Sequence, residues 1–117
     1  MIEIKRIQQQ PDLVQAIYAV MTDVYTVSPW NLEQILADLS QDQTWYALAF
    51  DGVEVIAFLA VQENFFEAEV LQIAVKKAYQ GQGIASDLFA TLPTDKEIFL
   101  EVRKSNQRAQ AFYKKEK

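Results

Sequence analysis

Two glycines lie close together between Gln80 and Ser86, where an apolar run ends and a helical pattern begins. Glycine lets the backbone approach a ligand closely, and the first N–H groups of a helix lack intrahelical partners and lie at its positive end. The segment can therefore bind a pyrophosphate through backbone amides, with Lys76 and Lys77 adding positive charge nearby. On the glycines alone, an ordinary tight turn of small residues explains the segment equally well.

Two other phosphate-binding motifs can be tested on the same residues. The chain contains no Gly-x-x-x-x-Gly-Lys-Ser/Thr sequence, which excludes a P-loop nucleotide hydrolase. The dinucleotide fingerprint fits Gly81, Gly83 and Ser86, with Glu101 following at about the expected distance of roughly 20 residues. However, five residues separate the apolar run from Gly81, and a β-meander precedes the turn, so we set this motif aside.

The composition limits the chemistry. The 117 residues include no cysteine and no histidine, which excludes disulfides, thiolate metal sites, a thiol nucleophile and the most common general base and metal ligand. Acid–base chemistry must fall to Glu, Asp, Tyr, Lys or water, and we expect no metal site.

Charge is unevenly distributed. The chain carries 11 basic and 16 acidic residues, a net charge of −5, which argues against a nonspecific nucleic-acid-binding protein. Residues 1–75 hold two bases against eleven acids, a net of −9, whereas residues 76–117 hold nine bases against five acids, a net of +4. We expect an anionic ligand in the last third. A cationic partner suits the acidic remainder, although solvated faces that merely differ explain the pattern as well.

The hydrophobic pattern predicts the elements that position the turn. It indicates strands at 2–5, 45–50, 53–61, 68–75 and 97–102, with Asp51-Gly52 as a hairpin turn. Helical spacing predicts helices at 11–21, 32–39, 86–92 and 106–115. Asn31 is the expected N-cap of the second helix, with Gln34 completing a capping box.

The order β-α-α-β-β-β-α-β-α predicts one α+β domain over residues 1–117, with a mixed, mostly antiparallel sheet flanked by helices. One late β–α–β unit supplies a parallel pair of strands. We recognise no signal peptide and no apolar run of roughly 18 residues, so we expect a cytoplasmic protein without a membrane span.

Read from Gln80, the turn has the form Gln-x-x-Gly-x-Ala, and here the chain resembles the GNAT superfamily of N-acetyltransferases, whose acetyl-CoA motif is Arg/Gln-x-x-Gly-x-Gly/Ala. The resemblance runs from about Ile2 to the last residue. Ile73-Ala74-Val75 resembles the bulged fourth strand, whose backbone pairs with the pantetheine arm. Leu100-Glu101-Val102-Arg103-Lys104-Ser105-Asn106 followed by Phe112-Tyr113, and Ser28-Pro29-Trp30, resemble the branch that acetylates the N-terminal alanine of ribosomal proteins.

The resemblance implies roles for individual residues. It makes Glu101 the general base, acting through water, and Tyr113 the general acid that protonates the departing thiolate in a direct transfer. Taken alone, Glu101 reads as an exposed carboxylate at a strand end, Tyr113 as a core aromatic and Asn106 as a helix N-cap. The residues implied to contact acetyl-CoA are Ile73, Ala74, Val75, Gln80, Gly81, Gln82, Gly83, Ile84, Ala85, Ser86 and Asn106.

The acceptor implied by the branch is the N-terminal alanine of a small-subunit ribosomal protein. The net charge of −9 over residues 1–75 is compatible with a basic peptide, and equally with a polyamine or an aminoglycoside. We expect no nucleic-acid or membrane partner. A CoA-binding module without catalysis, and an interaction protein that keeps only the scaffold, stay open as alternatives.

Two features depart from the family pattern. Pro93 shortens the third helix, and the chain stops at Lys117, where the family continues through a Gly-Phe pair into two further strands. Lacking those two strands, the strand at 97–102 would be an exposed edge with an apolar face. We expect that edge to pair with a second copy in a homodimer, to exchange elements with it, or to be covered by the chain's own tail.

Overall fold

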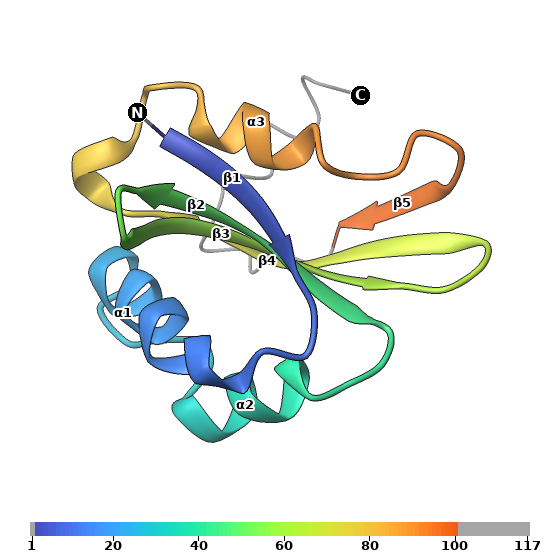
Figure 1. Cartoon of the computed structure of the whole chain (residues 1–117), viewed down its shortest axis with the longest axis horizontal. Coiled ribbons are helices and arrows are strands. Elements are labelled where there is room, and N and C mark those ends of the chain that lie inside the picture. The colour runs from blue at the N-terminus through green and yellow to red at the C-terminus, as the bar shows by residue number, and fades with distance from the viewer. Residues whose placement is uncertain (1, 101–117) are drawn as a thin grey trace.

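The structure, a computed structural model, describes residues 2–100 (Figure 1). Within them the elements, in chain order, are β1 (Ile2–Ile7), η1 (Pro11–Leu13), α1 (Val14–Val24), α2 (Leu32–Leu39), β2 (Thr44–Asp51), β3 (Glu54–Glu63), β4 (Glu67–Val75), η2 (Lys77–Tyr79), α3 (Ile84–Phe89) and β5 (Glu97–Leu100), where η marks a short 3-10 helix. The predicted strand residues 101–102 and the predicted helix at 106–115 lie outside the described residues.

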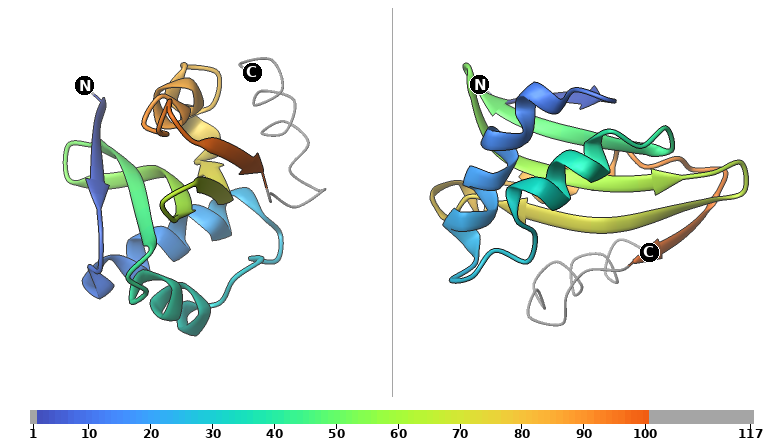
Figure 2. Two further views of the ribbon diagram at one scale, coloured as in Figure 1. Left: turned by 90° about the vertical axis from the view of Figure 1, so that its right-hand side faces the viewer. Right: turned by 90° about the horizontal axis from the view of Figure 1, so that it is seen from below.

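The described strands form one sheet in the order β1-β2-β3-β4-β5. Neighbours from β1 to β4 are antiparallel, and β5 pairs in parallel with β4 after the α3 crossover. Helices α1 and α2 cover one face of the sheet and α3 covers the other (Figure 2). The predicted mixed, mostly antiparallel α+β fold is therefore confirmed.

Each face of the sheet has its own hydrophobic core. Ile17, Met21 and Ile35 pack on the α1/α2 face with Tyr46 and Phe58. The α3 face is built from a second cluster that contains Trp45, Leu59, Val70, Ile73, Ile84 and Leu88. Successive side chains of a strand point to opposite faces of the sheet, and helices cover both faces of β2 to β4. Both sets of side chains are therefore apolar, which explains the nearly continuous apolar sequences of these strands.

The polar positions next to the α1/α2 core are hydrogen-bonded. The buried hydroxyl of Tyr46 donates to Asp38 Oδ2 on α2 at 2.7 Å. Burial raises the pKa of Asp38, against the opposing effect of hydrogen bonds from Tyr46 and Thr44. This contact ties α2 to the centre of the sheet.

The start of α2 follows its prediction closely. Asn31 Oδ1 accepts from the Gln34 amide, and Gln34 Oε1 accepts from the Asn31 amide, both at 2.8 Å. These reciprocal bonds form the expected capping box. Pro11 instead opens η1, so that the first regular helix begins three residues later, at Val14.

The β2–β3 hairpin differs by one residue from its prediction. Its two turn residues are Gly52 and Val53, and Asp51 belongs to β2, where it pairs with Ile2 and Glu54. Gly52 takes a φ of 64°, a conformation that suits glycine at the first position of a two-residue turn. Asp51 is held in the strand because its carboxylate accepts a hydrogen bond from Tyr79 at 2.6 Å.

Candidate active site

The glycine turn (residues 80–86) joins the end of β4, through η2, to the start of α3. Gly81 and Gly83 have φ values of 81° and 82°, in the left-handed region that glycine tolerates best. Gly83 is the N-cap, so α3 begins at Ile84, two residues before the predicted start. A Cβ atom added at Gly83 would meet nothing within 4 Å, so open space lies next to the backbone here.

Polar groups around the glycine turn hold its shape. Gln80 Nε2 donates to the carbonyl oxygen of Val75 at 3.0 Å, which closes the loop on itself. The amide of Lys77 donates to Asp23 Oδ2 at the end of α1, at 2.7 Å. The expected cation Lys76 is engaged elsewhere, because its Nζ forms an ion pair with Glu54 at 2.9 Å.

Tyr79 fixes the turn to the β2–β3 hairpin. The hydrogen bond to Asp51, with desolvation and the nearby carboxylate charges adding to it, raises the pKa of Tyr79 to about 12. The phenol therefore stays protonated at neutral pH and donates to Asp51. The loop is thus anchored to β2, α1 and β4 by contacts that do not use the amides of the glycine turn.

The first N–H groups of α3 are the donors that the turn offers to a ligand. The first hydrogen bond of the helix runs from the Asp87 amide to the Gly83 carbonyl, so the amides before Asp87 have no partner within the helix. Such groups bind anions well at the positive end of a helix. This arrangement fits a pyrophosphate held by backbone amides.

The last part of β4 leads into the turn. Ile73 and Ala74 are buried and Val75 is half-buried, all at the end of the strand. The strand has a bulge, as the resemblance implies, but it lies at Leu71, before Ile73-Ala74-Val75, where the register with β3 shifts between the Ala60–Gln72 and Val61–Val70 pairs. Within residues 2–100, the paired positions of β4 and β5 run from Glu67–Glu97 to Val70–Leu100.

Sequence reasoning missed Gln72, a buried polar residue beside the bulge. Its Oε1 accepts from the hydroxyl of Tyr25 at 3.1 Å, which links β4 to the segment between α1 and α2. A lone amide within the apolar stretch from Val70 to Val75 was the available signal. Gln72 ties this segment to the part of β4 next to Ile73.

Three predicted site residues, Glu101, Asn106 and Tyr113, lie outside the described residues and stay predictions. The strand that precedes Glu101 has the expected apolar face. Ile98 and Leu100 pack against the α3-side core, whereas Glu97 and Phe99 are exposed. Pairing of this edge with a second copy also stays a prediction.

Residues 2–100 contain neither a cluster of side chains suited to a metal ion nor a helix suited to a membrane span. In this part of the chain, no group of three or more Asp or Glu side chains is arranged to hold a metal ion. None of the described helices is long and apolar enough to cross a membrane.

Solved structures share this architecture. The ribosomal-protein-S18-alanine N-acetyltransferase of Escherichia coli superposes with a TM-score of 0.83 at 24% identity, over 98% of this chain and 76% of that one. The PaiA N-acetyltransferase of Thermoplasma acidophilum, solved in complex with coenzyme A, gives a TM-score of 0.80 at 18% identity, over 99% and 88% of the two chains. At these identities the likeness supports the fold alone.

Sequence comparison leads to the same family. A Bacillus subtilis strain 168 protein, provisionally named a [ribosomal protein bS18]-alanine N-acetyltransferase, is 28% identical over 110 residues, which span 87% of this chain and 72% of that protein. The model of the acetyltransferase (GNAT) family matches residues 11–116, which include β4, the glycine turn and α3. A match over nearly the whole chain, on a sheet with this strand order, makes the protein a member of the GNAT family of acetyltransferases.

Proposed function

We propose that this acetyltransferase takes its acetyl group from acetyl-CoA bound at the glycine turn. The observation that carries the proposal is the pair of left-handed glycines at the start of α3, with open space at Gly83 and with nearby polar side chains engaged in holding the loop. The amides of residues 81–86 would hold the pyrophosphate, and the end of β4 at Ile73, Ala74 and Val75 would pair with the pantetheine arm. Gln80 shapes the turn through its bond to Val75.

We further propose that the acceptor is the N-terminal alanine of a ribosomal protein. The name of the Bacillus subtilis relative supports this choice, and so does the acidic balance of residues 1–75, which suits a basic peptide. Glu101 would accept the amine proton through water, and the amine nitrogen would then form a bond to the acetyl carbon. As the carbon–sulfur bond breaks, Tyr113 would protonate the leaving thiolate, and Asn106 would contact the CoA arm.

The test is acetylation of a short basic peptide that begins with alanine, followed by mass spectrometry. The matched control is the same peptide with a blocked N-terminus, and an aminoglycoside and a polyamine serve as small-amine probes. We expect acetyl-CoA-dependent modification of the free N-terminus only. Glu101→Gln and Tyr113→Phe should each lower kcat by roughly 10²–10⁴-fold if the two residues act as base and acid.

Other outcomes would lead to a different function or to different residue roles. Turnover with an aminoglycoside or polyamine but not with the peptide would identify a small-molecule amine acetyltransferase. Binding of acetyl-CoA without turnover on any probe would leave a CoA-binding module. Unchanged kcat in Glu101→Gln and Tyr113→Phe would remove those two role assignments.

A further inference from the structure

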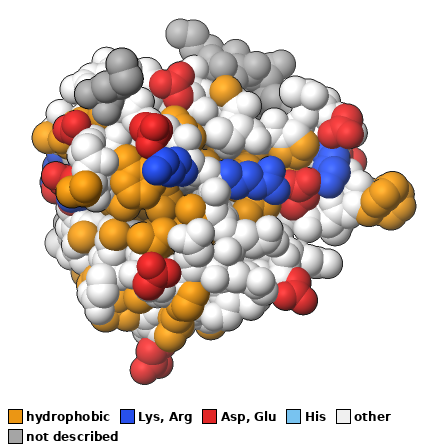
Figure 3. Space-filling view, in the orientation of Figure 1, with side chains coloured by type: hydrophobic (Ala, Val, Ile, Leu, Met, Phe, Trp, Pro, Cys, Tyr) orange, Lys and Arg blue, Asp and Glu red, His pale blue; other side chains and the backbone are white. Residues whose placement is uncertain are grey.

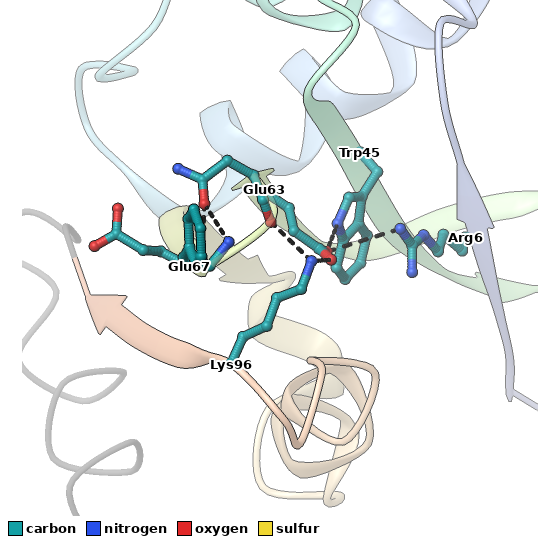
Figure 4. A network of polar contacts seen from close by, with 7 residues as sticks. Arg6, Trp45, Glu63, Glu67 and Lys96 are labelled. Atoms are coloured by element: carbon teal, nitrogen blue, oxygen red, sulfur yellow. Dashed lines mark hydrogen bonds and ion pairs between the residues drawn. The ribbon is translucent and has the colours of Figure 1, made fainter.

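A polar network lies at the end of β4 opposite the glycine turn. Glu63, the last residue of β3, accepts from Lys96 Nζ at 2.5 Å and from the Trp45 indole Nε1 at 2.8 Å. Figure 4 shows Lys96 reaching across from the segment before β5. Arg6 of β1 lies over the Trp45 ring at 4.0 Å and 3.9 Å from Glu63. Glu63 thus links β1, β2 and β3 to the segment before β5.

Lys96 also contacts the turn that starts β4. Its Nζ donates to the carbonyl oxygen of Asn64 at 2.7 Å. The side-chain oxygen of Asn64 in turn accepts from the amides of Phe66 and Glu67, both at 2.8 Å. Through Asn64, the Lys96 ammonium group is linked to Glu67, the first residue of β4. In the chain, Lys96 immediately precedes Glu97, the first residue of β5.

Neighbouring surface groups do not share this arrangement. Figure 3 shows the face that carries β1, with basic and acidic side chains close together and a hydrophobic projection over the β3–β4 hairpin, where Phe65 and Phe66 are exposed. Lys5 on the same sheet forms an ion pair with Glu3 of its own strand at 3.2 Å and lies over the Phe50 ring at 5.6 Å, and the side chains of Lys5 and Glu3 are largely exposed. Lys96 and Glu63 are mostly buried, with side-chain exposures of 20% and 18%.

The hydrophobic pattern alone does not fix the register of β5 on β4, because one shifted pairing also keeps aliphatic side chains on the core face. A contact such as that between Lys96 and Glu63 is needed to exclude it. A shift of one residue would turn Ile98 and Leu100 away from the core. A shift of two residues toward the start of β5 keeps an aliphatic face, since Leu100 would replace Ile98 and Val102 would replace Leu100. That slip moves every β5 residue by about 6.6 Å along β4. It also separates Lys96 from Glu63.

We propose that Lys96 and Glu63 are positioning residues, whose contact fixes the register of β5 on β4 and so places Glu101, the residue after Leu100. This inference rests on the proposed function for its catalytic half, because Glu101 is the proposed base. A displacement of about 1 Å can lower a rate by about 10²-fold, so a slip of two residues would remove the base from the reaction. The glycine turn, at the other end of β4, would keep its shape.

The register can be measured without any substrate, because the chain has no cysteine of its own. Glu67→Cys/Glu97→Cys places thiols on a pair that is opposite in the present register, and Glu67→Cys/Phe99→Cys places them on a pair that only the slip brings together. We expect oxidation to crosslink mainly the first pair. Adding Lys96→Met should lower the yield for the first pair and raise that for the second, whereas Lys5→Met should change neither.

Kinetics then test the catalytic half. Lys96→Met should lower kcat by about tenfold or more, with the Kd for acetyl-CoA within about twofold of wild type, and Lys96→Arg should restore kcat. Should Lys96→Met not fold, Glu63→Gln keeps an acceptor for the Trp45 indole and must shift the crosslinks in the same direction. Unchanged crosslink yields would overturn the proposal, and so would an altered register with an unchanged kcat. If wild type acetylates no probe, the proposed function fails, whereas the crosslinks still decide the register.

Discussion

The two ends of β4 differ in the donors that their polar contacts leave for a ligand. At the hairpin end, the Lys96 ammonium is paired with the Glu63 carboxylate and also bonds to the Asn64 carbonyl. At the glycine turn, the side chains of Gln80 and Asp23 bond to the Val75 carbonyl and the Lys77 amide, and these contacts do not use the amides of residues 81–86. The first end is therefore suited to hold protein against protein, and the second leaves helix amides for a ligand.

This difference explains how an acidic protein can bind a polyanion. The net charge of −5 opposes binding at long range, but backbone donors at a helix start carry local positive potential whatever the side-chain balance. Lys76 adds little, because Glu54 neutralises it. We therefore expect substitutions in the glycine turn to affect acetyl-CoA binding and substitutions at the hairpin end of β4 to leave it unchanged.

The largest expected effect comes from Gly83→Ala. Both Gly83 and Gly52 have positive φ and open space at the Cβ position, so an alanine at either site strains the backbone by about 1–2 kcal/mol. Gly83→Ala should also weaken acetyl-CoA binding by about tenfold or more, whereas its matched control Gly52→Ala should leave the affinity unchanged. Calorimetric titration measures both, and equal affinities in the two variants would contradict a role for the turn.

A smaller effect is expected from Asn64→Ala at the hairpin end. The substitution removes the acceptor for the amides of Phe66 and Glu67 and should lower the free energy of unfolding by about 1 kcal/mol. Urea denaturation measures the change. Acetyl-CoA affinity should stay at the wild-type value. A parallel loss of affinity would show that the hairpin end of β4 does affect binding at the glycine turn.

Acid should weaken the hairpin end through Glu63. Burial acts to raise the pKa of Glu63, but hydrogen bonds from Lys96 and Trp45 and the nearby positive charges outweigh it, so the pKa lies below its ordinary value of 4.5. The stability that Glu63 contributes is therefore present above pH 4.5 and is lost as the pH falls through the lowered value. Glu63→Gln should unfold with a shallower pH dependence below pH 4.5, as measured by urea denaturation across that range. An unchanged slope would show that the ion pair contributes nothing.

The smallest effect is expected from Lys76→Met. Because the Lys76 ammonium is paired with Glu54, its loss should change the Kd for acetyl-CoA by less than about threefold. A titration at low and at moderate salt measures this, with Lys5→Met as the control. A tenfold loss at low salt would mean that the turn binds through side-chain charge.

Much of the fold could be predicted because its signals are local. The capping box of Asn31 and Gln34 acts within one turn of helix, and the meander is visible as apolar runs separated by polar residues. The hairpin prediction was wrong by one residue because Tyr79, far along the chain, binds Asp51 into the strand. Local turn chemistry cannot include such a contact.

The site was predictable only in part, for a similar reason. The glycines indicated the candidate ligand-binding turn, but nothing in the sequence indicates that Asp23 bonds to the Lys77 amide, 54 residues away. The pairing of Lys96 with Glu63 is equally hidden, since any of the chain's acidic residues could have been its partner. Both contacts join segments that only the three-dimensional fold brings together: α1 with η2 in the first case, and the end of β3 with the segment before β5 in the second.

The most direct test of the central claim is a titration of the protein with acetyl-CoA, followed through backbone amide resonances by NMR. The account predicts saturable shifts at residues 73–75 and 80–86, and no comparable shifts at residues 63–67. Absence of any shift at millimolar acetyl-CoA, or shifts centred on residues 63–67, would contradict it.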